Sequence, residues 1–193
     1  MEKGGASSAI VKSIVLVVLG ALVVFGLFMV LTRTKKNPSK DEDYQLTVVD
    51  EITTIELDKT YPASARKVVD LYAKTMKALY KEDYNSEQEA KMLAVLKGIM
   101  DQELLDNNLN FEATTKKEVK GRKEEDYSIS NYNIQTREPE EVTVDGRKMC
   151  DVDCIFYLRH GSRGETYYYE FVMRREEGTG NWKILGWTLK DTE

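Results

Sequence analysis

The sequence predicts an α+β domain that follows an N-terminal transmembrane helix. Apolar residues first recur at steps of three and four, as in amphipathic helices, and after Gly121 they recur at steps of two, as in half-buried strands. Helical patterns that precede strand patterns, rather than alternating with them, indicate two or three helices packed on an antiparallel sheet of about four strands. An uncharged apolar run near the N-terminus predicts the transmembrane helix.

The transmembrane helix is predicted at residues 13–32. No charged residue lies between Ile14 and Leu31, and about 18 residues at roughly 1.5 Å each span about 27 Å, close to the hydrocarbon thickness of a bilayer. A cleaved signal peptide is the alternative, but no A-x-A-like site comes after the run, which is longer than the usual apolar region of such a peptide. The chain therefore divides into a tail at residues 1–12, this anchor, a polar linker at residues 33–44 and an α+β domain at residues 45–193.

Two signals for the orientation of the anchor disagree. More basic residues lie after the span than before it, which by the positive-inside rule would place the domain in the cytoplasm. The short N-terminal flank is instead typical of a signal anchor, which exports the domain on its C-terminal side. We expect a single-pass protein of the cell membrane whose domain is extracytoplasmic. The basic residues near the span are Lys3 and Lys12 before it, and Arg33, Lys35, Lys36 and Lys40 after it.

The acidic balance of the chain argues against a nucleic-acid partner. The chain has 28 basic and 33 acidic side chains, a formal net charge of −5, and no basic stripe. It also lacks a phosphate-cradling glycine loop, a dinucleotide fingerprint, a zinc-protease helix motif and a Gly-x-Ser-x-Gly elbow. We therefore predict no cofactor and no nucleic acid.

Three helices are predicted in residues 61–124. Ser64 is placed to cap the first, which ends near Glu82. Ser86 and Glu89 are spaced as the capping box of the second, which Gly98 bends or divides. The third runs from Phe111 to Glu124 and would pack through Phe111, Thr115 and Val119. The apolar stripes of the first two comprise Val68, Val69, Tyr72, Met76, Leu79 and Tyr80, and then Met92, Leu93, Leu96, Met100 and Leu104.

Before these helices, the segment LTVVDEITTIELDKT fits two structures. Its β-branched residues favour a strand, whereas Asp50 before Glu51 would also suit the start of a short helix. Both interpretations stay open from the sequence.

Strands come after the helices. The first is predicted at Tyr127–Thr136 and the second at Glu141–Val144, after which Asp145-Gly146 is the favoured two-residue hairpin turn. Residues 147–175 then form a long antiparallel hairpin around the sequence HGSRG, and Trp182–Leu189 is the last strand. One face of the hairpin is apolar and predicted to be buried: Cys150, Val152, Cys154, Phe156 and Leu158, then Tyr167, Tyr169, Phe171 and Met173.

Cys150 and Cys154 are the only cysteines. On one strand they would lie about 13 Å apart at roughly 3.3 Å per residue, which is too far for a disulfide. A metal site would need further soft ligands, and the chain has one histidine. We expect buried, unreactive thiols, with an intermolecular disulfide or a metal site as alternatives.

Three other polar residues are candidates for acid–base chemistry. Asp151 and Asp153 alternate with the apolar face, so we place them on the outer surface with Arg174 or Lys183 as neighbours. His160 begins a polar turn and has no nucleophile with an orienting acid near it in the sequence. We predict no catalytic residue and no metal ligand among them.

Two stretches resemble known proteins. The string TYPASARKVVDLYAKTMKALY, with Tyr61-Pro62, Ser64 and Tyr72, resembles the first helix of an uncharacterised, membrane-anchored family from Gram-positive bacteria. The ending NWKILGW resembles the terminal strand of that family and of the nuclear transport factor 2-like superfamily. The resemblance implies a cone, in which a curved antiparallel sheet wraps over helices, with a cavity at its wide end and display outside the membrane. The superfamily includes isomerases, dehydratases, hydrolases and members without enzymatic activity, so it leaves function open.

An aromatic set would line such a cone. It could form a packed core, or a pocket for a small apolar or aromatic ligand, because buried tyrosine hydroxyls need partners. The candidate residues are Tyr72, Met76 and Tyr80 from the first helix and Tyr167, Tyr169, Phe171 and Trp187 from the sheet.

The sequence favours a non-enzymatic binding or accessory module of the cell envelope, with an envelope protein or a small apolar ligand as partner. This hypothesis rests on a cavity face that we expect to lack histidine and acidic groups. The alternative is a small-molecule binder or isomerase-like enzyme with a tyrosine-lined pocket of about 300 Å³ or more. A third hypothesis, cytoplasmic display with redox-active cysteines, requires an exposed thiol with a lowered pKa.

Overall fold

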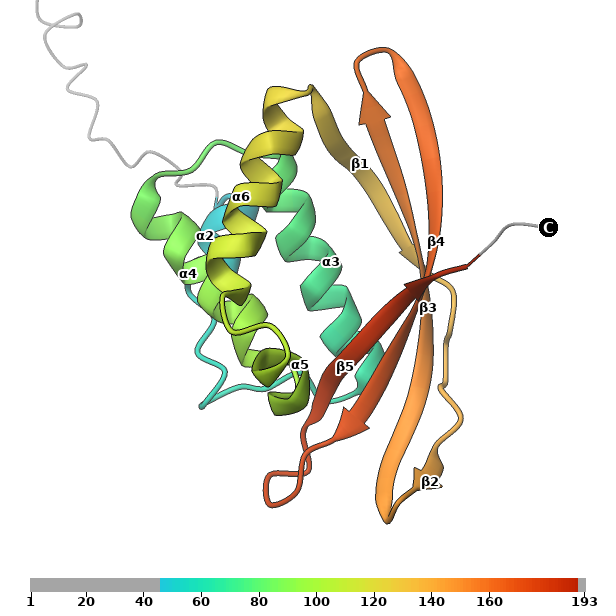
Figure 1. The fold of residues 1–193 in the computed structure, drawn as a ribbon. Coiled ribbons are helices and arrows are strands. Elements are labelled where there is room, and N and C mark those ends of the chain that lie inside the picture. Colours follow the sequence, from blue (N-terminus) through green and yellow to red (C-terminus); the bar gives the residue numbers. More distant parts are fainter. Residues whose placement is uncertain (1–45, 191–193) are drawn as a thin grey trace, which may run out of the picture. The chain divides into compact units, whose positions relative to one another are not determined.

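Five helices pack on one side of an antiparallel sheet in the computed structural model, which describes residues 46–190 (Figure 1). This arrangement confirms the predicted α+β class. The helices are α2 (Val48–Thr53), α3 (Ala65–Lys81), α4 (Ser86–Gly98), α5 (Gln102–Asp106) and α6 (Phe111–Glu124), and the strands are β1 (Tyr127–Ile134), β2 (Val142–Val144), β3 (Arg147–His160), β4 (Arg163–Arg175) and β5 (Trp182–Leu189).

Within residues 46–190, no helix has both the length and the apolar run needed to cross a bilayer. The predicted tail, transmembrane anchor and linker at residues 1–12, 13–32 and 33–44 lie outside the described residues.

The β3–β4 hairpin is the centre of the sheet, whose strand order is β1-β3-β4-β5. Its register runs from Met149 opposite Arg174 to His160 opposite Arg163. β1 and the short β2 pair with different halves of the other edge of β3. Asp145 and Gly146 both have positive φ, at 50° and 78°, as the predicted two-residue turn between β2 and β3 requires.

Side-chain caps determine where α2, α3 and α4 begin. The ambiguous segment before α3 is the helix α2, because Thr47 and Asp50 form a reciprocal capping box at its start. Ser64 caps α3 as predicted. The capping box predicted for Ser86 and Glu89 is wrong: Asn85 and Gln88 form it instead, and Ser86 is the first residue of α4.

Gly98 divides the second predicted helix rather than bending it. Beyond it the backbone bonds to β5: Ile184 donates to the Ile99 carbonyl at 2.9 Å and Asp101 donates to the Ile184 carbonyl at 2.8 Å. A Cβ at Gly98 would lie 2.5 Å from Cδ1 of Leu57, so a larger residue would require the Leu57 side chain to move.

Ion pairs at the sheet differ from those predicted. Arg174 binds Asp101, the buried N-cap of α5, and also Glu103 at 2.7 Å. Lys183 donates to the Gly98 carbonyl at 2.7 Å. Asp151 is exposed and Asp153 pairs with Lys190 at 2.8 Å, so neither Arg174 nor Lys183 is their partner. The prediction failed because Lys183 bonds to the last residue of α4 and Arg174 bonds to the start of α5.

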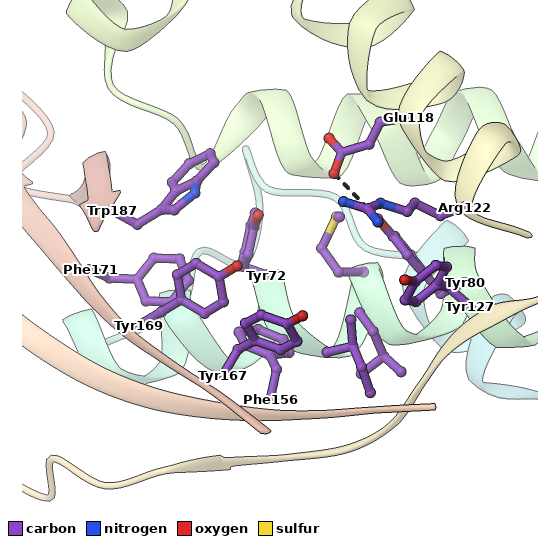
Figure 2. Close-up of a pocket in the computed structure, with 13 residues that line it drawn as sticks. Tyr72, Tyr80, Glu118, Arg122, Tyr127, Phe156, Tyr167, Tyr169, Phe171 and Trp187 are labelled. Atoms are coloured by element: carbon purple, nitrogen blue, oxygen red, sulfur yellow. Dashed lines mark hydrogen bonds between the residues drawn. The ribbon is translucent and has the colours of Figure 1, made fainter. Parts of the chain in front are cut away.

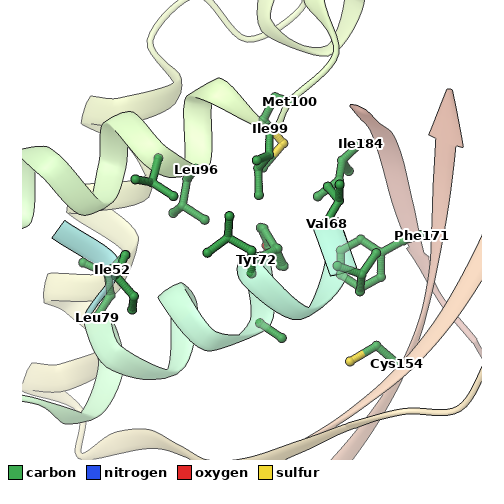
Figure 3. Packing of buried hydrophobic residues seen from close by; sticks show 14 of the residues in the cluster. Ile52, Val68, Tyr72, Leu79, Leu96, Ile99, Met100, Cys154, Phe171 and Ile184 are labelled. Carbon is green, nitrogen blue, oxygen red and sulfur yellow. The ribbon is translucent and has the colours of Figure 1, made fainter. Parts of the chain in front are cut away.

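The core lies between α3 and the inner face of the sheet and continues between α3 and the helices α2 and α4 (Figure 3). The two cysteines are free thiols buried in it, and burial raises the pKa of each to about 12. Both are therefore protonated at neutral pH, as expected for unreactive core residues. The cytoplasmic redox hypothesis required a lowered pKa, which these positions do not provide.

Candidate ligand pocket

A cavity of about 210 Å³ lies between α3, α6 and the sheet (Figure 2). Eight of its thirteen lining residues are aromatic. The lining consists of Tyr72, Met76 and Tyr80 from α3, Glu118 and Arg122 from α6, Tyr127 and Ile129 from β1, Phe156 and Leu158 from β3, Tyr167, Tyr169 and Phe171 from β4, and Trp187 from β5.

All seven candidate residues from the sequence lie around this one cavity. Tyr72, Met76 and Tyr80 share one face of α3 because residues four apart on a helix are neighbours. Tyr167, Tyr169 and Phe171 all face the cavity because every second side chain of a strand points to the same face. Trp187 joins them through a β-bulge: β5 advances three residues from Ile184 to Trp187 while β4 advances two from Met173 to Phe171.

The aromatic rings at one end of the cavity contact one another. The ring centroids of Tyr72 and Phe171 lie 5.2 Å apart in an edge-to-face arrangement, and those of Tyr72 and Trp187 lie 5.5 Å apart. Tyr169 extends this wall toward Phe156, with centroids 5.8 Å apart. These contacts fix the rings in place, so the apolar end of the pocket is preformed.

The hydroxyls of Tyr72 and Tyr169 have no hydrogen-bond partner within residues 46–190. Both residues line the cavity, and the Tyr72 side chain is only 9% exposed. In contrast, Tyr80 donates to Glu118 at 3.4 Å and Tyr167 donates to Glu165 at 2.7 Å. Neither oxygen is fully enclosed, so both hydroxyls can bond to a ligand in the cavity.

Three tyrosines of the pocket, Tyr72, Tyr80 and Tyr169, remain protonated at neutral pH. Burial, and then the negative charge of Glu118, raise the pKa of Tyr72, Tyr80 and Tyr169 above the ordinary value for tyrosine. Their hydroxyls are thus available as hydrogen-bond donors rather than as bases.

Charged side chains form the other end of the pocket. Glu118 and Arg122 lie one turn apart on α6, and the Arg122 guanidinium lies 5.0 Å from the centre of the Tyr127 ring. Among the described residues, neither forms an ion pair. The expectation that the cavity face lacks acidic groups is therefore wrong. Sequence patterns do not distinguish these two residues because α6 is mostly charged, with only Phe111 and Val119 buried.

The cavity is smaller than the isomerase-like alternative required. Its volume of about 210 Å³ is below the roughly 300 Å³ typical of pockets for drug-sized ligands. A protein cavity of about 150 Å³ can nevertheless hold benzene. The pocket thus suits a single ring or branched alkyl group with a few polar atoms.

The other polar candidates lie outside this pocket. His160 is exposed at the β3–β4 turn and stacks on Tyr127, with ring centroids 4.1 Å apart. Asp151 and Asp153 do not line the cavity. Across residues 46–190, no group of three or more His, Cys, Asp or Glu side chains is placed to hold a metal ion.

Comparison with known proteins yields a family and distant structural likenesses. Residues 1–187 match the model of a family described as "Domain of unknown function (DUF6715)". No curated protein matches the chain. Among solved structures it is similar to the crystal structure of the intermembrane space region of chloroplast protein ARC6, at 12% identity and a TM-score of 0.38, with 68% of this chain and 97% of that chain covered. A likeness of this size carries no argument about function.

Proposed function

The chain belongs to the DUF6715 family, and we propose that its α+β domain is a non-catalytic binding module whose pocket holds a small, mainly apolar ligand. The observation that carries this proposal is the preformed aromatic cavity with unpartnered tyrosine hydroxyls. Apolar walls with a few fixed polar groups are the usual construction of a small-molecule site.

The polar groups of the pocket favour binding over catalysis. Tyr72, Tyr80 and Tyr169 are protonated donors, and the lining contains no serine, cysteine or histidine to act as a nucleophile or proton shuttle. Glu118 and Arg122 can each orient a ligand by a charge-assisted hydrogen bond.

A proton-transferring enzyme is the second candidate, and Glu118 is the reason to consider it. A carboxylate beside tyrosine hydroxyls could remove a proton next to a carbonyl while a hydroxyl stabilises the resulting oxyanion. Deuterium exchange into cyclohexanone, measured in D₂O, tests this activity. Exchange catalysed by the native chain and lost in Glu118→Gln would favour the enzyme over the binding module.

We propose that the domain has the cone-shaped architecture of the nuclear transport factor 2-like superfamily and that residues 13–32 anchor it to the outer side of the cell membrane. The sequence resemblance and the uncharged run between Ile14 and Leu31 support this proposal. A surface protease applied to intact cells should remove a tag placed at Glu193. Protection of the tag until lysis would place the domain in the cytoplasm.

Calorimetric titration of the full chain with toluene tests the binding proposal. We expect saturable binding at one site, and its loss in Leu158→Phe, which adds volume at the cavity wall. Leu189→Phe is the matched control, because Leu189 is 55% exposed and does not line the cavity. Absence of binding to the native chain, or equal effects of the two substitutions, would contradict the proposal.

An envelope protein as partner is a second part of this proposal. Cross-linking in intact membranes before purification should return the same partner from native chain in repeated experiments. Recovery of that partner by a chain with an unrelated anchor and no α+β domain would show that the domain does not recognise it.

A further inference from the structure

The pocket has two chemically distinct ends (Figure 2). At one end, Tyr72, Phe171 and Trp187 present contacting rings. At the other end, Glu118 and Arg122 project from α6. A ligand that fills the cavity therefore needs an apolar part and a polar part that meets both charges.

The two charges are opposite and close to each other. Residues four apart on a helix surface have Cβ atoms roughly 5–6 Å apart. Neither Glu118 nor Arg122 forms an ion pair within the described part of the chain, and each has one weaker contact, with Tyr80 and Tyr127 respectively. Both charges are thus available to a ligand.

A ligand with a single charge would satisfy only one of them. An amine would pair with Glu118 and be repelled by Arg122. A carboxylate would pair with Arg122 and be repelled by Glu118. A zwitterion with its ammonium and carboxylate on the same carbon matches both charges. The guanidinium can bind a carboxylate through two parallel hydrogen bonds.

We propose, on the basis of the binding function above, that the pocket recognises a free α-amino acid with an aromatic or branched apolar side chain. Its side chain lies against the rings of Tyr72, Phe171 and Trp187. Its ammonium binds Glu118 and its carboxylate binds Arg122. The volume of about 210 Å³ limits the ligand to a single amino acid rather than a peptide.

Three ligands that share a phenyl ring test this inference in calorimetric titrations of the full chain. Phenylalanine carries both charges, phenethylamine lacks the carboxylate, and 3-phenylpropionate lacks the ammonium. We expect phenylalanine to bind about tenfold tighter, or more, than either analogue, because each analogue loses one charge-assisted hydrogen-bond set.

Charge-removing variants make the test specific to α6. Glu118→Gln should weaken the binding of phenylalanine about tenfold and leave the binding of 3-phenylpropionate unweakened. Arg122→Gln should also weaken the binding of phenylalanine about tenfold, but leave the binding of phenethylamine unweakened. Lys117→Gln, at an exposed position of the same helix outside the cavity lining, is the matched control and should change none of these affinities.

The outcomes separate the inference from the proposed function. If phenethylamine or 3-phenylpropionate binds as tightly as phenylalanine, the zwitterion inference is wrong and the ligand is a cation or an anion. If toluene binds and all three charged ligands fail, the apolar pocket stands without amino-acid recognition. If toluene also fails, the proposed function is wrong.

Discussion

The two ends of the β3–β4 hairpin meet the helices in different ways. Away from the turn, the inner face carries Cys150, Val152 and Met173, each at most 2% exposed, and packs solidly with Ile184 and α3. Toward the turn, the same face carries aromatic residues and encloses a cavity.

The difference shows how residue size divides one continuous interface into core and site. Small and flexible side chains interdigitate and leave no room, whereas rigid rings in edge-to-face and tilted contact leave a gap between the sheet and the helices. The side chains of α3 also become larger along the helix, from Val68 and Val69 in the core to Tyr72 and Tyr80 at the cavity. Substitutions that remove side-chain atoms should therefore lower stability strongly in the core and little at the pocket.

The largest expected effect concerns the thiols of the packed end. With a pKa of about 12, Cys150 and Cys154 should react with iodoacetamide at pH 8 about a thousandfold more slowly than thiols of ordinary pKa. Mass spectrometry of the native chain and of the chain in guanidinium chloride measures both rates. Similar rates would show that the packed end opens readily.

Truncation of Ile184 should destabilise the packed end strongly. Its side chain is fully buried, so Ile184→Ala should lower the free energy of unfolding by about 2–5 kcal/mol, measured with urea. Leu189→Ala, on the same strand but 55% exposed, should change it by less than about 0.5 kcal/mol. A small effect of Ile184→Ala would mean that this end is not closely packed.

Asp101 should make the packed end sensitive to acid. Burial alone would raise its pKa, but the hydrogen bonds from Arg174 lower the pKa below the ordinary value. The folded state thus binds fewer protons than the unfolded state at acidic pH, and stability should fall as the pH drops below about 5.

Removal of the Asp101 carboxylate should abolish its contribution to the loss of stability at acidic pH. Asp101→Asn should cost about 2–3 kcal/mol at neutral pH, because Arg174 keeps only the exposed Glu103. Glu103→Gln is the control and should cost less than about 1 kcal/mol. Urea unfolding across pH 3–7 measures both variants, and an unchanged acid profile in Asp101→Asn would contradict the assignment.

The smallest expected effect distinguishes a satisfied hydroxyl from an unsatisfied one. Tyr61 donates to the Trp182 carbonyl at 2.9 Å, so Tyr61→Phe should cost about 1 kcal/mol of unfolding free energy. Tyr72 has no such bond among the described residues and its hydroxyl oxygen is not fully enclosed, so Tyr72→Phe should change the free energy of unfolding by less than about 0.5 kcal/mol. A loss in Tyr72→Phe equal to that in Tyr61→Phe would make Tyr72 an ordinary core residue.

Much of the fold is determined by local patterns in the sequence. The β3–β4 hairpin was predictable because the alternation along each strand is a local signal, and the Asp145-Gly146 turn between β2 and β3 is another. α6 was predicted with its observed bounds. The end of α4 was less predictable, since it depends on backbone hydrogen bonds to Ile184, far away in the sequence. The partners of Arg174 and Lys183 result from that same distant contact.

The pocket was predictable only where its residues are apolar. Tyr72, Met76 and Tyr80 belong to a helical stripe, and the residues of β4 belong to an alternating face. Glu118 and Arg122 belong to a helix whose many charges look alike in sequence. Only the packing of α6 against α3, α4 and β1 shows which two of them face the cavity.

Methionine methyl resonances provide the most direct test of the contrast between pocket and core. Met76 lines the cavity, whereas Met92 and Met173 are fully buried outside its lining. In the full chain labelled with [¹³C-methyl]methionine and titrated with toluene, the Met76 signal should shift saturably while those of Met92 and Met173 stay in place. No shift at Met76, or equal shifts at all three, would contradict a ligand pocket at the aromatic end of this interface.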